Sequence, residues 1–240
     1  ALAPPAVVTL PEKQVMRLSF RGVDGTNDPD FISAHINHQV KKGDQWVKDR
    51  VSRHVFLSGD ESDEKSVILA PGKYRVTASR GPEFSVHQTT LTLSSGQETK
   101  LSIDVPQRVV NTPGYMSADF HVHSGQSFDN NLGTKPRLKS YVAQGAEILV
   151  ATEHDTIYDF TDLIESMGLA SKLKTVTGTE LTTELGNPTV PFGLGHANIF
   201  PLKVQALLPR RGAPKHENHR WRDVISELRV NGDRPLVQLN

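Results

Sequence analysis

Two histidines separated by one residue, at positions 121 and 123, are the first candidates for chemistry in this 240-residue chain. On a β-strand, residues i and i+2 point to the same face, so the imidazoles of His121 and His123 can converge on one metal ion. The chain contains ten histidines, and one such spacing is therefore unremarkable by chance. The pair therefore predicts a metal site only if further candidate ligands lie elsewhere in the sequence.

A second candidate position follows the next predicted strand. The run 148–152 consists of Ile, Leu, Val, Ala and Thr, which indicates a buried strand, and Glu153, His154 and Asp155 come directly after it. Alternation places the His154 side chain on the face opposite to Glu153 and Asp155. In βα architectures the C-terminal ends of strands carry the chemistry, because the loops there are free to vary. His154 is therefore a candidate ligand.

Two further elements extend the pattern. The predicted strand 173–179 leads directly to Glu180, and His196 opens the predicted strand 196–200. Four successive elements thus present a histidine or a glutamate near one edge. Imidazole and carboxylate ligands suit Zn, Mn or Fe, and a chain without cysteine has no thiolate ligand. The set predicts a metal site of a hydrolase, with His121, His123, His154 and Glu180 as its main ligands.

Composition restricts the functions open to the chain. Lys and Arg total 27, Asp and Glu also total 27, and the formal net charge is zero. This balance predicts no general attraction to nucleic acid, and no apolar stretch approaches the roughly 20 residues that cross a bilayer. We therefore expect a small-molecule substrate. The chain begins without Met, which slightly favours removal of a secretory signal and hence a periplasmic or secreted protein.

The first 110 residues have the pattern of an antiparallel β-sandwich. Short runs with a period of two, such as 73–78 and 101–105, are separated by turns rich in Gly, Pro and Ser. After residue 114, apolar strands alternate with segments of helical length, which is typical of a parallel βα sheet or barrel. The sequence predicts strands over 117–123, 147–153, 173–179, 196–200 and 235–239, and helices over 136–144, 160–167 and 221–230.

The ordered motifs of the second half resemble a known superfamily. His121-Val122-His123, Thr152-Glu153-His154-Asp155, Gly178-Thr179-Glu180 and Gly195-His196 are similar to the motifs of the PHP (polymerase and histidinol phosphatase) superfamily. The closer likeness is to its CehA/McbA-type metallohydrolases, in which a segment like 111–124 joins a β-sandwich to the catalytic domain. The segment 71–84 also fits that N-terminal module, which is of the carboxypeptidase-regulatory-like kind.

The resemblance implies a fold and a set of ligands. The fold class would be α/β plus β, with a β-sandwich over residues 1–110 and a PHP-type distorted (βα)7 barrel over residues 111–240. The barrel would hold two or three divalent metal ions. The implied ligands are His121 and His123 on one ion, Glu180 bridging two, His154 and His196 on neighbouring ions, and Asp129 in the loop after the first strand.

One departure from the superfamily concerns closure of the barrel. The superfamily pattern requires further ligands later in the chain, whereas this sequence stops at Asn240, after the fifth predicted strand. Five parallel strands cannot close such a barrel, and the last strand would expose an unpaired edge. The sequence therefore predicts a barrel truncated after about five strands, which a C-terminal continuation or a partner chain would complete.

The implied reaction is hydrolysis by a metal-bound hydroxide. Phosphoesters are the usual substrates of the superfamily, while the closer branch favours carbamates, esters or amides. Asp155 and His154 are the candidate catalytic residues, because one of them could protonate the leaving group. Lys135 and Arg137 follow the first strand and could hold a phosphate, although an ordinary surface role is favoured for both.

Several of these residues also have a purely structural interpretation. Asp129 lies in a polar run where a turn is nearly as well supported as ligation. For Asp119 and Glu153, contact with the metal ligands is a better-supported interpretation than direct binding of the metal. His216 and His219 lie in basic, loop-like surroundings that predict a solvated segment. The remaining expectations are a surface or strand position for His35 and His38 and a core position for Phe192.

A second functional hypothesis comes from a different class. The chain could be a non-catalytic β-sandwich binding or scaffolding protein whose attached PHP domain has degenerated. The ligand set from His121 to His196 favours the hydrolase. Metal content separates the two hypotheses, because a degenerate domain would fold without tightly held ions.

Overall fold

The chain is described from a computed structural model. The structure describes residues 3–31, 39–42, 45–48, 52–130, 132–183, 195–217, 219–230 and 234–240. The chain divides into two compact units, of which the first holds residues 1–115 with 135–146 and the second holds residues 116–134 with 147–240. His35, His38 and Phe192 lie outside the described residues.

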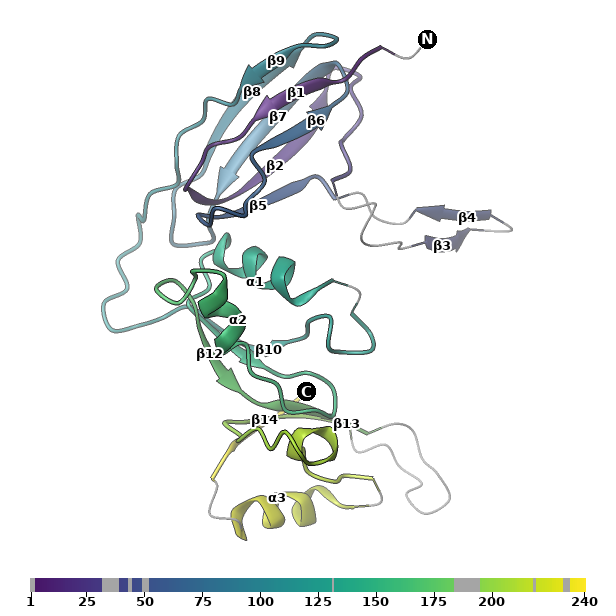
Figure 1. Ribbon diagram of the computed structural model, residues 1–240, viewed down its shortest axis with the longest axis vertical. Helices are drawn as coiled ribbons and strands as arrows, with labels where there is room; N and C mark the ends of the chain where they lie inside the picture. The colour runs from purple at the N-terminus through teal and green to yellow at the C-terminus, as the bar shows by residue number, and fades with distance from the viewer. Residues whose placement is uncertain are drawn as a thin grey trace. The chain divides into compact units, whose positions relative to one another are not determined.

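The first unit is built from β-sheets (Figure 1). In a three-stranded sheet, β1 (Ala6–Thr9) lies between β6 (Ser66–Leu69), antiparallel to it, and β9 (Glu98–Lys100), parallel to it. A four-stranded antiparallel sheet has the order β5 (His54–Ser58), β2 (Val15–Val23), β7 (Gly72–Ser79) and β8 (His87–Leu93). A further antiparallel pair consists of β3 (Gln39–Lys42) and β4 (Gln45–Lys48).

Alternating side chains of these strands form the core of the first unit. On β2, Met16, Leu18 and Phe20 are fully buried, and they belong to one cluster with Val8 of β1 and Val76 of β7. A strand with one face on a core requires this period of two, because successive side chains point to opposite faces. The three-stranded and four-stranded sheets therefore bury their inner faces against one another.

The helix α1 (Thr134–Val142) is followed by a close backbone approach within the first unit. Gly145 has φ +83°, and a Cβ added to it would lie 2.6 Å from the backbone oxygen of Arg80. Glycine is required there, because other residues disfavour this conformation and have no room for a side chain. Beside it, Arg17 Nη1 donates to Gln144 Oε1 at 3.0 Å.

Asp63 joins a turn of the first unit to α1. Its carboxylate accepts hydrogen bonds from the backbone N–H groups of Ser58 at 2.7 Å, Gly59 at 2.8 Å and Asp60 at 3.2 Å. The same carboxylate lies 3.0 Å from Lys139 Nζ on α1, and both side chains of this ion pair are largely buried. One carboxylate thus satisfies several donors that would otherwise lack a partner.

The second unit contains two three-stranded sheets. The parallel sheet has the order β10 (Ala118–Val122), β11 (Ile148–Ala151) and β12 (Lys174–Thr177), and α2 (Thr161–Ser166) lies between β11 and β12 in the chain. The antiparallel sheet has the order β13 (Thr179–Thr182), β14 (His196–Phe200) and β15 (Leu236–Leu239). The short 3-10 helix η1 (Pro209–Gly212) precedes α3 (Trp221–Val230).

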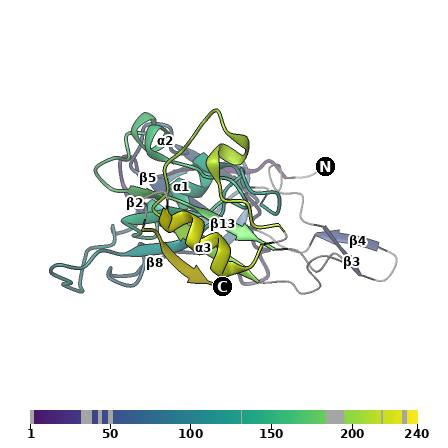
Figure 2. The same ribbon diagram turned by 90° about the horizontal axis from the view of Figure 1, so that it is seen from below.

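The helix α3 packs on the antiparallel sheet (Figure 2). Its Val224 and Leu228 form one buried cluster with Leu181 of β13 and Ile199 of β14. This apolar stripe at helical spacing is what a helix on a sheet surface needs. No helix in the described part of the chain combines the length and apolarity needed to span a bilayer.

A single residue, Gly178, separates β12 from β13. A Cβ at this position would lie 2.8 Å from the backbone oxygen of Ile199 and 3.1 Å from that of Ala151. The close approach requires glycine, and it lets the chain pass from the parallel sheet into the antiparallel one. Just beyond it, an isolated parallel bridge joins His154 to Glu180 and connects the two sheets.

The predicted fold class, with a PHP-type (βα)7 barrel truncated after about five strands, is wrong. A parallel barrel needs a crossover connection, usually a helix, between consecutive strands. Among the described residues there are three α-helices against fifteen strands. The third predicted strand, 173–179, is broken at Gly178, and the fourth and fifth, seen as β14 and β15, pair antiparallel. An apolar run does not encode strand direction, and the sequence pattern therefore missed this reversal.

The substitution Asp63→Ala tests the role of this carboxylate. It leaves three backbone donors without their acceptor and removes the carboxylate beside Lys139, which keeps its hydrogen bond to the Ser62 backbone oxygen. We expect the free energy of unfolding to fall by about 2–4 kcal/mol. Urea unfolding followed by circular dichroism measures the change. The neighbouring exposed Glu61→Ala is the matched control and should stay within about 0.5 kcal/mol of the wild type. Equal stability of the two variants would contradict the assignment.

Candidate metal centre

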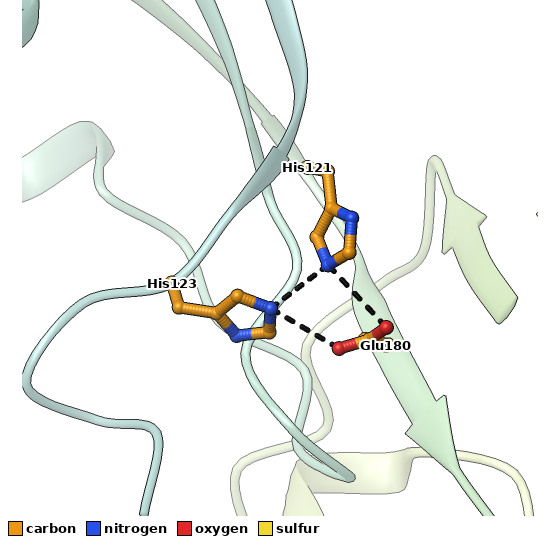
Figure 3. A group of neighbouring side chains, drawn as sticks. All are labelled: His121, His123 and Glu180. Carbon is orange, nitrogen blue, oxygen red and sulfur yellow. Dashed lines mark hydrogen bonds and ion pairs between the residues drawn. The ribbon is translucent and has the colours of Figure 1, made fainter. Parts of the chain in front are cut away.

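His121, His123 and Glu180 converge in the second unit (Figure 3). His121 lies on β10, His123 follows that strand directly, and Glu180 lies on β13. The Nε2 atoms of the two histidines are 2.9 Å apart. His121 Nε2 is 3.3 Å from Glu180 Oε1, and His123 Nε2 is 3.1 Å from Glu180 Oε2. The i, i+2 spacing on a strand end thus delivers both imidazoles to one carboxylate.

These separations fit a shared metal ion. Imidazole and carboxylate ligands bind zinc at about 2.0–2.2 Å, and ligand atoms around one ion are then about 3.0–3.4 Å apart. The three distances of 2.9, 3.1 and 3.3 Å lie close to that range. The donor set also fits, because neutral imidazole and ionised carboxylate present lone pairs toward the same point.

Two more groups of three overlap with the first. His154 Nε2 is 3.2 Å from Asp129 Oδ2, and these residues form a group with His123. His154 Nδ1 is 3.2 Å from Glu180 Oε2, and His196 Nδ1 is 3.2 Å from Glu180 Oε1. The structure therefore brings together all six residues that the sequence named as ligands: His121, His123, Asp129, His154, Glu180 and His196.

Glu180 is the buried centre of this arrangement, with 1% of its surface exposed. Asn240 Nδ2 donates to Glu180 Oε1 at 2.8 Å and also contacts Asn198 Oδ1 at 3.1 Å. Burial raises the pKa of Glu180, but hydrogen bonds from His123 and Asn240 and the charges of His121 and His123 outweigh it and lower the pKa to about 2. The carboxylate is therefore ionised. Sequence reasoning missed both asparagines, which carry no motif.

The loop after β10 is held by Glu153, which is fully buried. The backbone N–H of Ser124 donates to both carboxylate oxygens, at 3.1 and 3.0 Å, and Ser127 Oγ donates to Oε2 at 2.5 Å. The Ser124 hydroxyl makes a further short contact to Oε1. Glu153 belongs to none of the three ligand groups, and its contacts position the segment that carries His123.

Ser127 fixes how the His123 ring presents its nitrogens. The Ser127 hydroxyl has one proton, which it donates to Glu153, so it must accept from His123 Nδ1 at 3.0 Å. In the neutral ring, His123 Nε2 then carries the lone pair, whereas the protonated ring donates from Nε2 to Glu180. Burial lowers the pKa of His123, but the carboxylates of Glu180, Asp129 and Glu153 outweigh it and raise the pKa.

Aromatic stacking restrains the His154 ring. The ring lies between His123, at a centroid distance of 4.3 Å, and Phe128, at 4.5 Å, with interplanar angles of 24° and 28°. Phe128 is itself 75% exposed, and it forms a partial cover over His154. No sequence motif distinguishes Phe128 from other loop aromatics.

Other predicted residues lie outside the three ligand groups. Asp119 Oδ1 accepts from the backbone N–H of His121 at 3.0 Å, which stiffens the end of β10. Asp155 Oδ1 accepts from the backbone N–H of Thr182 at 2.9 Å. Lys135 and Arg137 belong to the first unit, and their phosphate role stays a prediction.

The solvated segment predicted around His216 and His219 is half wrong. His216 is buried, with 4% of its surface exposed, and its Nε2 lies 3.3 Å from Asp155 Oδ1. His219 is exposed, as expected. The basic residues around His216 suggested a surface loop, but the side chain itself turns inward.

Comparisons with protein-family models, with curated proteins and with solved structures find no match to this chain.

The tautomer of His123 can be measured without activity. In metal-free protein, at a pH above the raised pKa of His123, we expect the neutral ring to carry its proton on Nδ1. Ser127→Ala removes the acceptor, so the population protonated on Nε2 should rise. Long-range ¹H–¹⁵N NMR correlations distinguish the two forms. Ser166→Ala on α2 is the control and should leave the ring unchanged, whereas an Nδ1–H form that persists in Ser127→Ala would contradict the role of Ser127.

Proposed function

We propose that the second unit is the centre of a metal-dependent hydrolase that acts on a small-molecule substrate. The ions would be held by His121, His123, Asp129, His154, Glu180 and His196. The observation that carries the proposal is the arrangement around Glu180, whose Oε1 faces His121 and His196 while its Oε2 faces His123 and His154. A carboxylate that offers each oxygen to different imidazoles suits a bridge between two ions.

The donor set restricts the metal and the reaction. Imidazole with carboxylate suits zinc, manganese or iron, and bound divalent ions supply Lewis acidity that polarises a substrate oxygen and lowers the pKa of water. No side-chain nucleophile is needed for such hydrolysis. Phosphoesters on one side, and carbamates, esters or amides on the other, are the substrate classes that fit. The resemblance of the ordered motifs to PHP-type metallohydrolases supports the same reaction class.

The chain's own residues contribute positioning and charge. Glu153 and Ser127 hold the loop that carries His123, and Phe128 stacks on His154. Asn240 donates to Glu180 and keeps its carboxylate oriented between the imidazoles. His154 has carboxylates beside both of its nitrogens, at 3.2 Å each, and could share an ion with either of them. Preorganisation of this kind lowers the cost of assembling a reactive site.

Metal content and turnover test the proposal directly. Purified protein reconstituted with Zn²⁺, Mn²⁺ or Fe²⁺ should retain at least about one ion per chain after gel filtration, measured by elemental analysis. It should hydrolyse one of three probes: an aryl phosphodiester, an aryl phosphomonoester or an aryl carbamate. Wild-type protein that folds but retains no ion would favour the non-catalytic scaffold instead.

The substitution Glu180→Gln tests whether Glu180 contributes to metal binding. It keeps the shape of the side chain but removes the charge that faces four imidazoles, and we expect metal affinity to fall by more than about 100-fold, beyond the usual effect of losing a group that merely orients a ligand. Competition with a chelator measures the affinity. Glu165→Gln, an exposed residue of α2, is the matched control and should bind as the wild type does. Equal affinities for the two variants would remove Glu180 from the site.

A further inference from the structure

His216 is a buried histidine that lies outside every ligand group. Its side chain is 3% exposed, and its Nε2 is 3.0 Å from the backbone oxygen of Thr182 and 3.3 Å from Asp155 Oδ1. Both neighbours accept hydrogen bonds, so Nε2 carries a proton and donates it. The ring is therefore held on this side by Thr182 and Asp155 together.

Both backbone polar groups of Thr182, its N–H and its C=O, are consequently hydrogen-bonded to Asp155 and His216. Its N–H donates to Asp155 Oδ1 at 2.9 Å, and its C=O accepts from His216 Nε2 at 3.0 Å. Thr182 ends β13 and lies opposite His196 in the register with β14. Its hydroxyl makes a short hydrogen bond with His154 Nδ1. A residue with a fixed backbone thus touches one candidate ligand and stands across from another.

We infer that His216 and Asp155 are positioning residues that fix Thr182 and, through its hydroxyl, orient the His154 ring for metal binding. Thr182 and Glu180 both contact Nδ1, and the ring turns its Nε2 toward Asp129, 3.2 Å away. The inference rests on the proposed metal centre and adds a second layer of contacts behind it. Groups that orient a metal-bound histidine in this way change metal affinity without touching the ion.

The other nitrogen of His216 argues against a role in packing alone. Nδ1 is buried and has no hydrogen-bond partner among the described residues, and Glu217 Oε2 is 4.0 Å away from it. A side chain needed only to fill space is better apolar, because a buried polar atom without a partner is unfavourable. The Nε2 contacts to Thr182 and Asp155 are what distinguish histidine from leucine at this position.

Cobalt binding tests the inference, because the visible absorption of Co²⁺ reports its coordination geometry. We expect His216→Leu to bind Co²⁺ about tenfold more weakly, with an altered visible spectrum, because His154 loses its support. His216→Gln places an amide N–H where Nε2–H lies, so its affinity should return to within about twofold of the wild type. The exposed His219→Leu is the matched control and should not differ from the wild type.

A second pair of variants covers the case in which His216→Leu does not fold. Thr182→Val removes only the hydroxyl and should reproduce the weaker binding and the altered spectrum, while Thr182→Ser should not. Urea unfolding of the metal-free proteins gives the structural readout, in which we expect His216→Leu to be at least as stable as the wild type. Loss of stability in parallel with affinity, in both His216 variants, would overturn the positioning role.

The outcomes for this inference and for the metal centre are distinct. Wild-type affinity and spectrum in His216→Leu or in Thr182→Val overturn the positioning role and leave the metal centre intact. Wild-type protein that binds no Co²⁺ overturns the metal centre, and the positioning role with it. Weaker binding in His216→Leu, restored in His216→Gln, supports both.

Discussion

Burial of an ionised carboxylate is the constraint around which the second unit is arranged. Glu180 has almost no exposed surface, and an isolated carboxylate in such a place is strongly unfavourable unless donors or cations surround it. Four imidazoles and the amide of Asn240 lie within 3.3 Å of its two oxygens. These partners come from β10 and the residue after it, the segment after β11, β14 and Asn240, so those segments must meet at one point.

Convergence of this kind requires a rigid frame, because four imidazoles from separate segments must be held against one carboxylate. Two carboxylates provide the frame, one fully buried and the other 29% exposed. Glu153 holds the loop after β10 through Ser124 and Ser127, and Asp155, two residues later, holds the end of β13 through Thr182. The short segment after β11 thus supplies a candidate ligand, His154, between two carboxylates that each position a neighbouring segment. The alternation of side chains along the chain makes this division possible.

The sequence predicted which residues come together better than it predicted the fold. His121 and His123 were found from their spacing, and His154 and Glu180 from charged residues that end apolar runs, because these signals are local. The direction in which β14 and β15 pair is set by contacts between segments distant in sequence, and no local pattern encodes it. Ser127, Thr182 and Asn240 are common polar residues whose roles depend entirely on their neighbours in space. The inward turn of His216 was missed for the same reason.

The site does not depend on the barrel that the motifs suggested. At Gly178 the chain leaves the parallel sheet, and two residues later Glu180 lies in register with His154 through an isolated bridge. The reversal into β14 then places Asn198 opposite Glu180 and His196 opposite Thr182. Antiparallel pairing of β13 with β14 therefore delivers His196 to the same carboxylate. A site built from the ends of strands requires only that those ends lie close together. The passage of the chain from the parallel to the antiparallel sheet at Gly178 is sufficient to bring them together.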